Sequence, residues 1–545
     1  MAHDALCDFV DKHAPVLERS AAVLQHVVRV ARQRRNSEQL VHRLPPELVS
    51  RIFTDLVSEN TPEGDQNLVT ATHVCRRWRL IALDDSSLWT GVNVVATRKH
   101  EHQAVAFIER SANRLIDVKF FGFMGLLNVL RMALGFRRAS RAHRIRSFVV
   151  GHRDENVVPT LMWTIAGSWY ATHLHTLHIL GTDSILDPEM ERFASVVSGM
   201  EAFDCVPAED LEWTPTPALR SLRLHGYHLN WKSRVYRNLT ELELRTPDAY
   251  PISQKRLLEI LKACPDLERL HLLLADPDEP FVETGDFIWD VSLPKLVKLD
   301  LHMISPGSVA KILEHLVLPP TTRYQLSSEE VHDVSILPMD LTRLPGLEGP
   351  TIIRADIFMP RDENVREPVT QVSCTHATIG DAVDPVLKLA LYAWETTGRS
   401  FATLPAVLDL SALETLVVTG LAVPLDDLAD LPWPALLRQL PALRTLRLVK
   451  PDGEEFLSAI DALVTDDPVP VPPGTARVPL LEEVEASGVE LTEELRVDLL
   501  DLFVVRKEQC RALPRLLLPQ ASGVEGEWVQ TVRSLGTQVI LGDAY

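Results

Sequence analysis

The sequence predicts an α/β protein in which a helical N-terminal part precedes a long solenoid of parallel strands with outer helices. Its 545 residues are 46% hydrophobic and 24% charged, a composition typical of folded globular chains. Amphipathic helical segments fill the first part of the chain, and a short leucine pattern returns about every 29 residues behind it. We therefore expect residues 1–40 to form a helix, residues 41–95 a small helical domain and residues 96–545 the solenoid.

The first helix is expected over residues 14–35. Pro15 suits a first helical turn, apolar residues follow at helical spacing, and Arg32, Arg34 and Arg35 complement the negative end of the helix. Two uses of its apolar side stay open. It could pack on the next domain, or it could pair between chains in a coiled coil, for which fewer than about four heptads are available.

Two amphipathic segments between residues 41 and 95 are expected to pack together. In the first, Pro45 and Pro46 pre-set a helical first turn, and a wide apolar stripe follows: Leu48, Val49, Ile52, Phe53, Leu56 and Val57. After a polar loop at residues 58–66, a second helical run places on one face Val74, Trp78, Ile81 and Ala82. The first stripe is wider than a small helix usually buries, so apolar surface is left for a partner.

A leucine pattern of the form LxxLxL repeats through the rest of the chain. The clearest copies start at Leu219, Leu239, Leu267, Leu296, Leu413 and Leu443, and weaker ones at Leu115, Ile145, Leu174 and Leu481. The spacing is that of leucine-rich repeats. The last two leucines of a copy point to one side of a strand, and helix-like runs at residues 257–264 and 309–316 can cover that side. The proline-rich residues 319–400 break the pattern, and irregular repeats or an insertion are expected there.

The residues between the leucines form the open side of the strands. Their charges are of both signs, which suits a protein partner and argues against a polyanion such as nucleic acid, because a polyanion demands one sign. The expected substrate-binding side chains are Arg223, His225, Glu243, Arg245, Arg269, His271, Lys298, Asp300 and Arg447. The alternative is that many of them are merely solvated.

The net charge of −20 is unevenly distributed. Residues 1–150 hold 22 Lys and Arg against 15 Asp and Glu, a net +7, which leaves 33 against 60, a net −27, for residues 151–545. Such an acidic body repels nucleic acid at long range. The basic cluster from Arg131 to Arg146 is best explained by a solvated helix on the outside of the array.

Several other functions find no support. The sequence has no nucleophile elbow, HExxH motif or phosphate-binding loop, so neither catalytic residues nor a cofactor is expected. His173 and His175 share a strand face while His178 points away, and no further ligand completes a metal site. Six cysteines without close pairing are typical of reduced thiols in the cytoplasm or nucleus. The aspartate-rich start argues against a signal peptide, and no apolar run is long enough to span a membrane.

The segment LPPELVSRIFTDL, followed by VCRRWRLIALDDSSLW, resembles an F-box. It has a Leu-Pro opening, an Ile-Phe helix, a Val-Cys-Arg-x-Trp helix and a closing Leu-Trp. The chain is similar to fungal F-box-like proteins with degenerate leucine-rich repeats, closely over about residues 41–95 and loosely over the repeats. The α/β fold is then an N-terminal helical F-box-like domain followed by an irregular leucine-rich-repeat-like solenoid. The loop at residues 58–67 is longer than in compact F-boxes.

The resemblance implies a non-enzymatic adaptor. In this family the F-box docks on the Skp adaptor of a cullin-RING ubiquitin ligase, and the repeats hold a protein substrate. The residues that match the adaptor-binding motif are Leu44, Pro45, Leu48, Ile52, Phe53, Leu56, Val74, Cys75 and Trp78. One alternative is that these motif residues only form the core of a self-contained helical domain. A second is that the protein is a stand-alone repeat scaffold whose helical domain caps the array. A third is that residues 319–400 form an enzyme.

Overall fold

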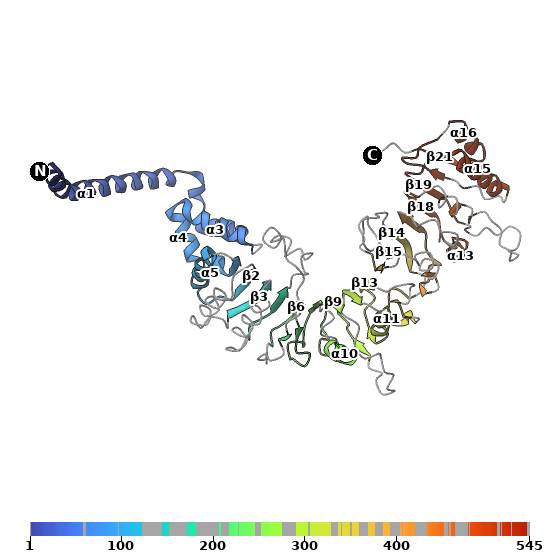
Figure 1. Cartoon of the computed structure of the whole chain (residues 1–545), viewed down its shortest axis with the longest axis horizontal. Coiled ribbons are helices and arrows are strands. Elements are labelled where there is room, and N and C mark those ends of the chain that lie inside the picture. Colours follow the sequence, from blue (N-terminus) through green and yellow to red (C-terminus); the bar gives the residue numbers. More distant parts are fainter. Residues whose placement is uncertain are drawn as a thin grey trace. The chain divides into compact units, whose positions relative to one another are not determined.

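The computed structural model divides into two compact units, whose helices and strands are labelled in Figure 1. The first comprises residues 1–201 and 211–218, and the second residues 202–210 and 219–545. The boundaries predicted after residues 40 and 95 both fall inside the first unit. The structure describes residues 2–57, 61–95, 98–121, 144–151, 172–180, 207–208, 217–226, 228–245, 252–274, 290–303, 306–328, 336–338, 340–348, 351–358, 369–376, 385–392, 404–405, 407–419, 433–451, 456, 459–460, 462–463, 478, 480–508, 513, 515–524 and 526–541.

The first unit begins with helices. In chain order these are α1 (Ala2–Ser37), η1 (Leu40–Arg43), α2 (Pro46–Val57), α3 (Pro62–Val74), α4 (Arg76–Asp84), η2 (Ser86–Trp89) and, after one strand, α5 (Arg98–Arg110). The start predicted for the first helix is wrong, because α1 begins at Ala2 and continues through Pro15, which lacks the backbone N–H of an ordinary helical residue. No described helix combines the length and apolar character needed to cross a lipid bilayer.

The single helical run predicted after residue 68 is broken at Cys75. This residue is extended, with φ −157° and ψ 166°, and it separates α3 from α4. Its Sγ accepts a hydrogen bond from the backbone N–H of Trp78 at 3.5 Å, so the thiol caps α4. The break ends α3 and starts α4 as a separate helix, which packs against both α2 and α3.

Residues 62–66 of the polar loop predicted at residues 58–66 belong to α3. Thr61 caps α3 by accepting a hydrogen bond from the N–H of Gly64 at 3.1 Å, and Pro62 stands in the first turn. At Gly64 the helix comes so close to α2 that an added Cβ would lie 2.6 Å from the backbone oxygen of Leu56. Glycine is therefore required where α2 and α3 approach each other.

Replacing Gly64 by alanine is expected to lower the free energy of unfolding by about 1–3 kcal/mol, because backbone has to move to make room for the methyl group. Urea denaturation followed by circular dichroism measures the effect. Thr70→Ala, an exposed change on the same helix, is the matched control and should stay within about 0.5 kcal/mol. A G64A variant as stable as the unaltered chain would contradict the close approach.

Parallel strands follow the helices in the first unit. β1 (Gly91–Val95), β2 (Ile116–Phe121), β3 (Ile145–Gly151) and β4 (Thr176–Leu180) pair in that order. The repeats predicted from Leu115, Ile145 and Leu174 fall on β2, β3 and β4. The apolar side chains within these strands, such as Val118, Phe148 and Leu177, are buried as the strand periodicity requires, whereas Leu115, just before β2, is 37% exposed.

The described end of the basic cluster is not a solvated helix, as the sequence had suggested. Arg144 is 4% exposed, and its guanidinium donates hydrogen bonds to the backbone oxygens of Arg114 at 2.8 Å and Ile108 at 3.2 Å. Arg146 lies in β3 and pairs with Asp117 of β2. Arg144 thus bonds to the backbone before β2, and Arg146 pairs with the neighbouring strand. The rest of the cluster lies outside the described residues.

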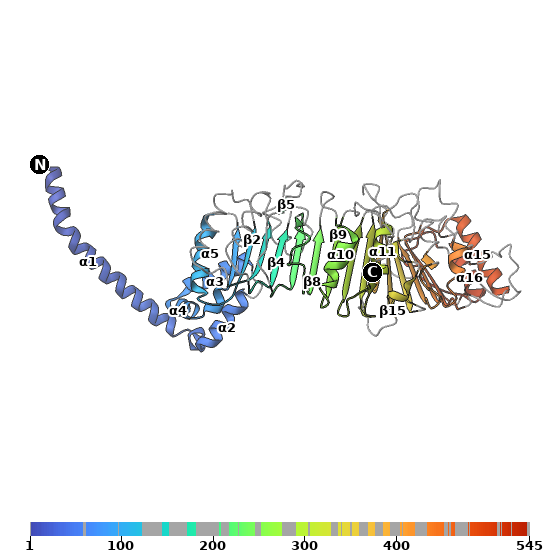
Figure 2. The same ribbon diagram turned by 90° about the horizontal axis from the view of Figure 1, so that it is seen from below.

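The second unit is built on a mostly parallel sheet, whose strands run side by side in Figure 2. The strands are β6 (Ser221–His225), β8 (Glu241–Arg245), β9 (Arg269–Leu274), β11 (Lys298–Met303), β13 (Arg323–Ser328), β14 (Ile352–Phe358), β15 (Val369–His376), β16 (Leu387–Tyr392), β17 (Thr415–Thr419), β18 (Thr445–Val449), β19 (Glu483–Ser487), β20 (Arg515–Leu517) and β21 (Gln538–Ile540). Two short parallel pairs accompany it, β5 (Pro207–Ala208) with β7 (His228–Leu229) and β10 (Val291–Ser292) with β12 (Leu316–Val317).

Helices cover the leucine side of this sheet. They are α10 (Gln254–Lys262), α11 (Pro306–Glu314), α13 (Trp433–Arg438), α15 (Glu493–Glu508), α16 (Gly526–Ser534) and the turn η6 (Leu341–Arg343). The leucines of the clear repeats are buried, for example Leu222 and Leu242, which face each other across β6 and β8. The expected parallel strands with outer helices are confirmed.

Residues 319–400 hold strands in a changed order. β13 pairs with β16, β16 with β15, β15 with β14, and β14 with β17. β15 runs antiparallel to both of its neighbours, while the outer pairs are parallel. The region is thus an insertion of the kind the broken pattern suggested: it joins the same sheet, but in reverse sequence order.

Candidate functional site

Helix α2 carries apolar side chains that the rest of the first unit leaves uncovered. Leu48, Ile52 and Leu56 follow one another at a spacing of four residues, so they lie on one face of the helix. They are 48%, 46% and 36% exposed, whereas Val49 and Phe53 on the other side are buried. We call Leu48, Ile52 and Leu56 the α2 stripe. The helix therefore has a core side and a separate apolar outer side.

Phe53 packs the core of this helical domain. It is completely buried, and its ring lies edge-on to that of Trp78, with the centroids 5.4 Å apart. This contact joins α2 to α4, and Trp78 is itself half-buried. In this structure Phe53 presents no surface to a partner, so its predicted place in an adaptor-binding surface is corrected to a place in the core.

Hydrogen bonds hold the segment before α2 against α4. Arg77 donates to the backbone oxygen of His42 at 2.6 Å and to that of Leu44. His42 Nε2 lies 3.6 Å from the Sγ of Cys75. Leu44 is half-buried and Pro45 is exposed. The two predicted motif segments are thus brought together by an arginine and a cysteine of the second segment.

Asp85 fixes the other end of this arrangement. Ser50 of α2 donates a hydrogen bond to its carboxylate, and the N–H of Ser87 donates a second at 3.0 Å. Burial raises the pKa of Asp85, but the hydrogen bonds from these serines outweigh it and hold the pKa below its ordinary value. Nearby, Trp89 Nε1 donates to the backbone oxygen of Ala82 at 2.6 Å. The core side of α2 is therefore anchored while the α2 stripe faces outward.

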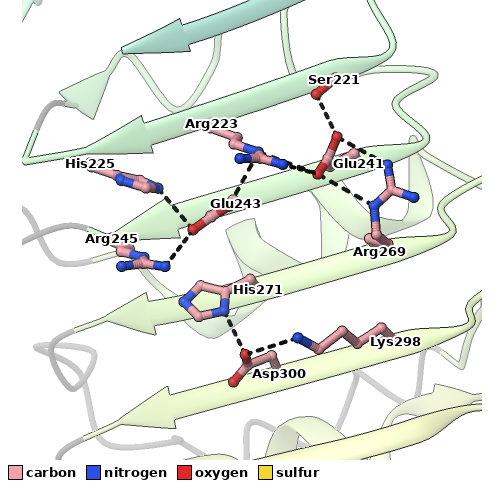
Figure 3. Close-up of polar contacts among 10 residues, drawn as sticks. All are labelled: Ser221, Arg223, His225, Glu241, Glu243, Arg245, Arg269, His271, Lys298 and Asp300. Carbon is pink, nitrogen blue, oxygen red and sulfur yellow. Dashed lines mark hydrogen bonds and ion pairs between the residues drawn. The ribbon is translucent and has the colours of Figure 1, made fainter. Parts of the chain in front are cut away.

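A second group of candidate side chains lies on the open face of the second unit's sheet (Figure 3). The Glu241 carboxylate accepts hydrogen bonds from Ser221 Oγ at 2.7 Å, from Arg223 Nη2 at 2.9 Å and from Arg269 Nη2 at 3.2 Å. Burial alone would raise the pKa of Glu241, but these donors lower it to about 2. The carboxylate stays ionised throughout the physiological range.

Glu243, two residues after Glu241 on β8, is likewise surrounded by cationic side chains. Arg223 Nε lies 3.3 Å, His225 Nε2 2.9 Å and Arg245 Nη2 2.8 Å from its carboxylate oxygens. Burial opposes ionisation, yet His225, His271 and Arg245 hold the pKa of Glu243 far below its ordinary value. One arginine, Arg223, therefore bridges both glutamates.

The remaining predicted substrate-binding residues fall into two places. His271 Nδ1 lies 2.7 Å from Asp300 Oδ2, and Lys298 Nζ lies 3.9 Å from the same oxygen. His271 is on β9, next to the strand of the glutamates, and Lys298 and Asp300 are on β11, one strand further. Arg447 is separate: it lies on β18 and pairs with Glu485 of β19 at 2.8 Å. Glu485 was not singled out from the sequence, although it occupies the matching position of its own repeat.

Neither surface resembles a metal centre. Among the residues that the structure describes, no group of three or more His, Cys, Asp or Glu side chains is placed to hold a metal ion. The acidic groups on the open face are instead occupied by arginine, lysine and histidine.

Residues 41–94 match the F-box-like family. This part of the chain is an F-box-like domain. The solved crystal structure of the Rad7 and Elc1 complex in yeast aligns with 96% of this chain and 97% of that chain, at 11% sequence identity and a TM-score of 0.20, which is too low to support an argument. No curated protein sequence matches the chain.

The predicted adaptor-binding residues differ in exposure within the F-box-like domain. The exposed ones are Pro45, Leu48, Ile52, Leu56 and Val74, and the half-buried ones are Leu44, Cys75 and Trp78. Their contact with an adaptor stays a prediction. Two further apolar side chains of α4, Leu80 and Leu83, are 55% and 43% exposed and were missed. The available signal was that they lie three residues apart, which places them together on one face of the helix.

Helix α1 precedes the F-box-like domain with its apolar side chains largely uncovered. Between 47% and 66% of the following side chains is exposed: Phe9, Val10, Val16, Leu17, Val23, Leu24, Val27, Val28 and Val30. A groove separates the last turns of α1 from α4, lined among others by Leu24, Val28, Cys75, Leu80 and Ile81. Close packing of this helix on the next domain is not what the structure shows. Its pairing between chains stays a prediction.

Proposed function

We propose that this chain is a substrate-recognition adaptor of a cullin-RING ubiquitin ligase. Its F-box-like domain docks on an Skp adaptor, and the open face of the strands in the second unit holds a protein substrate. The chain contributes no catalytic group of its own, since ubiquitin transfer belongs to its partners. The observation that carries the proposal is the α2 stripe, an uncovered apolar surface on an F-box-like domain.

The α2 stripe suits a helix that enters a groove of another protein. Its side chains stand one helical turn apart, the spacing by which amphipathic helices are recognised. Each is roughly half exposed, so covering all of them would stabilise a complex by about 2–4 kcal/mol from apolar burial alone. Such a contribution is large enough to matter for a specific complex and too small to be the whole interface.

Replacing Ile52 by glutamate tests the proposal. The residue is 46% exposed, so the free domain tolerates a carboxylate there, but docking would bury that charge against an apolar partner. Affinity for a recombinant Skp adaptor, measured by isothermal titration calorimetry with the full chain, should fall at least about tenfold.

Val105→Glu is the matched control, because Val105 lies on α5 outside the F-box-like domain and is 43% exposed. This variant should bind the adaptor as the unaltered chain does. Both V105E and I52E should have the melting temperature of the unaltered chain. Unchanged affinity in I52E, or no binding by the unaltered chain, would contradict the proposal. The second result would favour a repeat scaffold in which the helical domain serves as a cap.

A further inference from the structure

Arginine–glutamate ion pairs between neighbouring strands of the second unit share one arrangement: the carboxylate lies deeper than the guanidinium, whereas His225 lies deeper than Glu243. In the pairs Arg223–Glu241, Arg223–Glu243, Arg269–Glu241, Arg447–Glu485 and Arg515–Glu483, the glutamates are 11–19% exposed and the arginines 24–59%. Lys298 and Asp300 follow the same rule at 54% and 8%. The sheet thus presents the cationic ends of its ion pairs to the outside.

Geometry explains the order of the charges. The glutamates accept several hydrogen bonds close to the strands, which uses up their acceptor positions. An arginine is longer and carries five N–H donors in a planar fork, so it can satisfy a carboxylate below it and still direct donors outward. A partner that approaches this face meets guanidinium and ammonium groups first.

The cations also outnumber the carboxylates where the network is densest. On the open face of β6, β8, β9 and β11, the cations are Arg223, Arg245, Arg269 and Lys298, and the carboxylates are Glu241, Glu243 and Asp300. This local excess stands in a chain of net charge −20. The mixed composition of the face, which alone suggests no preferred sign, therefore hides a positive outer layer.

We propose that the substrate segment held on this face is a short acidic peptide, rich in Asp and Glu, whose carboxylates bind Arg245, Arg269 and Lys298. The inference rests on the proposed function and adds the chemistry of the cargo. Four neighbouring strands cover about 14 Å, a width that about five residues of an extended peptide cross. Arg269 and Lys298 lie at the same register of the neighbouring strands β9 and β11, whereas Arg245 lies four residues further along β8, so an acidic segment would contact the first two cations together and the third with a separate carboxylate.

The same face suits nucleic acid poorly. A short peptide meets mainly the local cations, whereas a long polyanion also meets the net −27 of residues 151–545. The open-face positions of these four strands also carry no Phe, Tyr or Trp, the side chains on which bases stack. An acidic protein segment is therefore the occupant to test.

Fluorescence anisotropy with the full chain tests the inference. The probe is a fluorescein-labelled peptide of alternating Glu and Ser, compared with a peptide of alternating Lys and Ser and with single-stranded DNA of equal charge. We expect the acidic peptide to bind, the basic peptide not to bind, and the DNA to bind at least about tenfold more weakly than the acidic peptide. The combined change Arg269→Gln and Lys298→Gln should weaken the acidic peptide at least about tenfold.

The control is Arg32→Gln with Arg35→Gln, which removes the same charge from exposed positions of α1 and should leave peptide affinity unchanged. Equal affinity for DNA, no binding of the acidic peptide, or full affinity in R269Q/K298Q would overturn the inference. A melting temperature within a few degrees of the unaltered chain shows that R269Q/K298Q is folded. Skp binding is measured on the unaltered chain: absence of acidic-peptide binding with adaptor binding present defeats this inference alone, and absence of adaptor binding with peptide binding present defeats only the proposed function.

Discussion

Replacing Phe53 by alanine is expected to unfold the F-box-like domain. The ring is completely buried and joins α2 to α4 through Trp78, so its removal leaves a cavity between the two helices. Substitutions of this kind cost about 3–5 kcal/mol, which is a large fraction of the stability of a small domain. Hydrogen exchange monitored by mass spectrometry should show faster exchange over residues 41–94, and adaptor binding should be lost as a consequence.

Ile52→Ala is the control for this prediction, because Ile52 is the neighbouring residue on the exposed side of the same helix. It should change the free energy of unfolding by no more than about 0.5 kcal/mol and yet weaken adaptor binding. The pair separates a residue that builds the domain from one that contacts a partner. Slow exchange over α2 in F53A would show that Phe53 is not part of the core.

Replacing Glu241 by glutamine is expected to destabilise the second unit by about 1–3 kcal/mol at pH 7. The carboxylate is nearly buried and accepts hydrogen bonds from Ser221, Arg223 and Arg269. Without it, the guanidinium of Arg223 has lost one of its two carboxylates. Breaking a buried ion pair would cost more, but Arg269 is half exposed, and water screens part of the loss.

The same glutamate makes stability depend on pH. Its pKa is about 2 in the folded chain against an ordinary value of 4.5, so the folded state holds the charged form more tightly than the unfolded state does. The stabilisation is complete above about pH 4.5 and is lost as the pH falls towards 2. Melting temperatures recorded from pH 7 to pH 3 should fall less steeply in E241Q than in the unaltered chain.

Glu482→Gln serves as the matched control. Glu482 pairs with Arg444, but both side chains are about half exposed, and exposed pairs contribute at most about 1 kcal/mol. This variant should keep the melting temperature and its pH dependence. If E241Q behaved in the same way, the Glu241 network would not contribute to stability.

Periodicity made the strands of this chain predictable. The repeats from Leu219, Leu239, Leu267 and Leu296 became adjacent parallel strands, because each places two leucines on one side of a strand and no single copy can bury them. The exposure of the α2 stripe could also be expected, because the apolar residues of this helix cover more of its surface than one core can bury. Both predictions depend on residue spacing along the chain alone.

What could not be predicted depends on three-dimensional context. Cys75 lies within a helical pattern, yet its backbone is extended and its thiol caps the helix that begins after it. The order of charges on the open face was hidden too, because the depth of Glu241 relative to Arg223 and Arg269 depends on side-chain length and hydrogen bonding. The composition of the face shows that charges of both signs are present, but it does not show which of them lies deeper.

The reversed strand order after β13 affects how the chain can fold as it leaves the ribosome. From β6 to β13, each new strand finds its neighbour already in place, so the sheet can grow with synthesis. The outer edge of β13 then stays open until β16, about sixty residues later, has emerged. During that interval the nascent sheet carries an unpaired edge, which is a template for pairing with another strand.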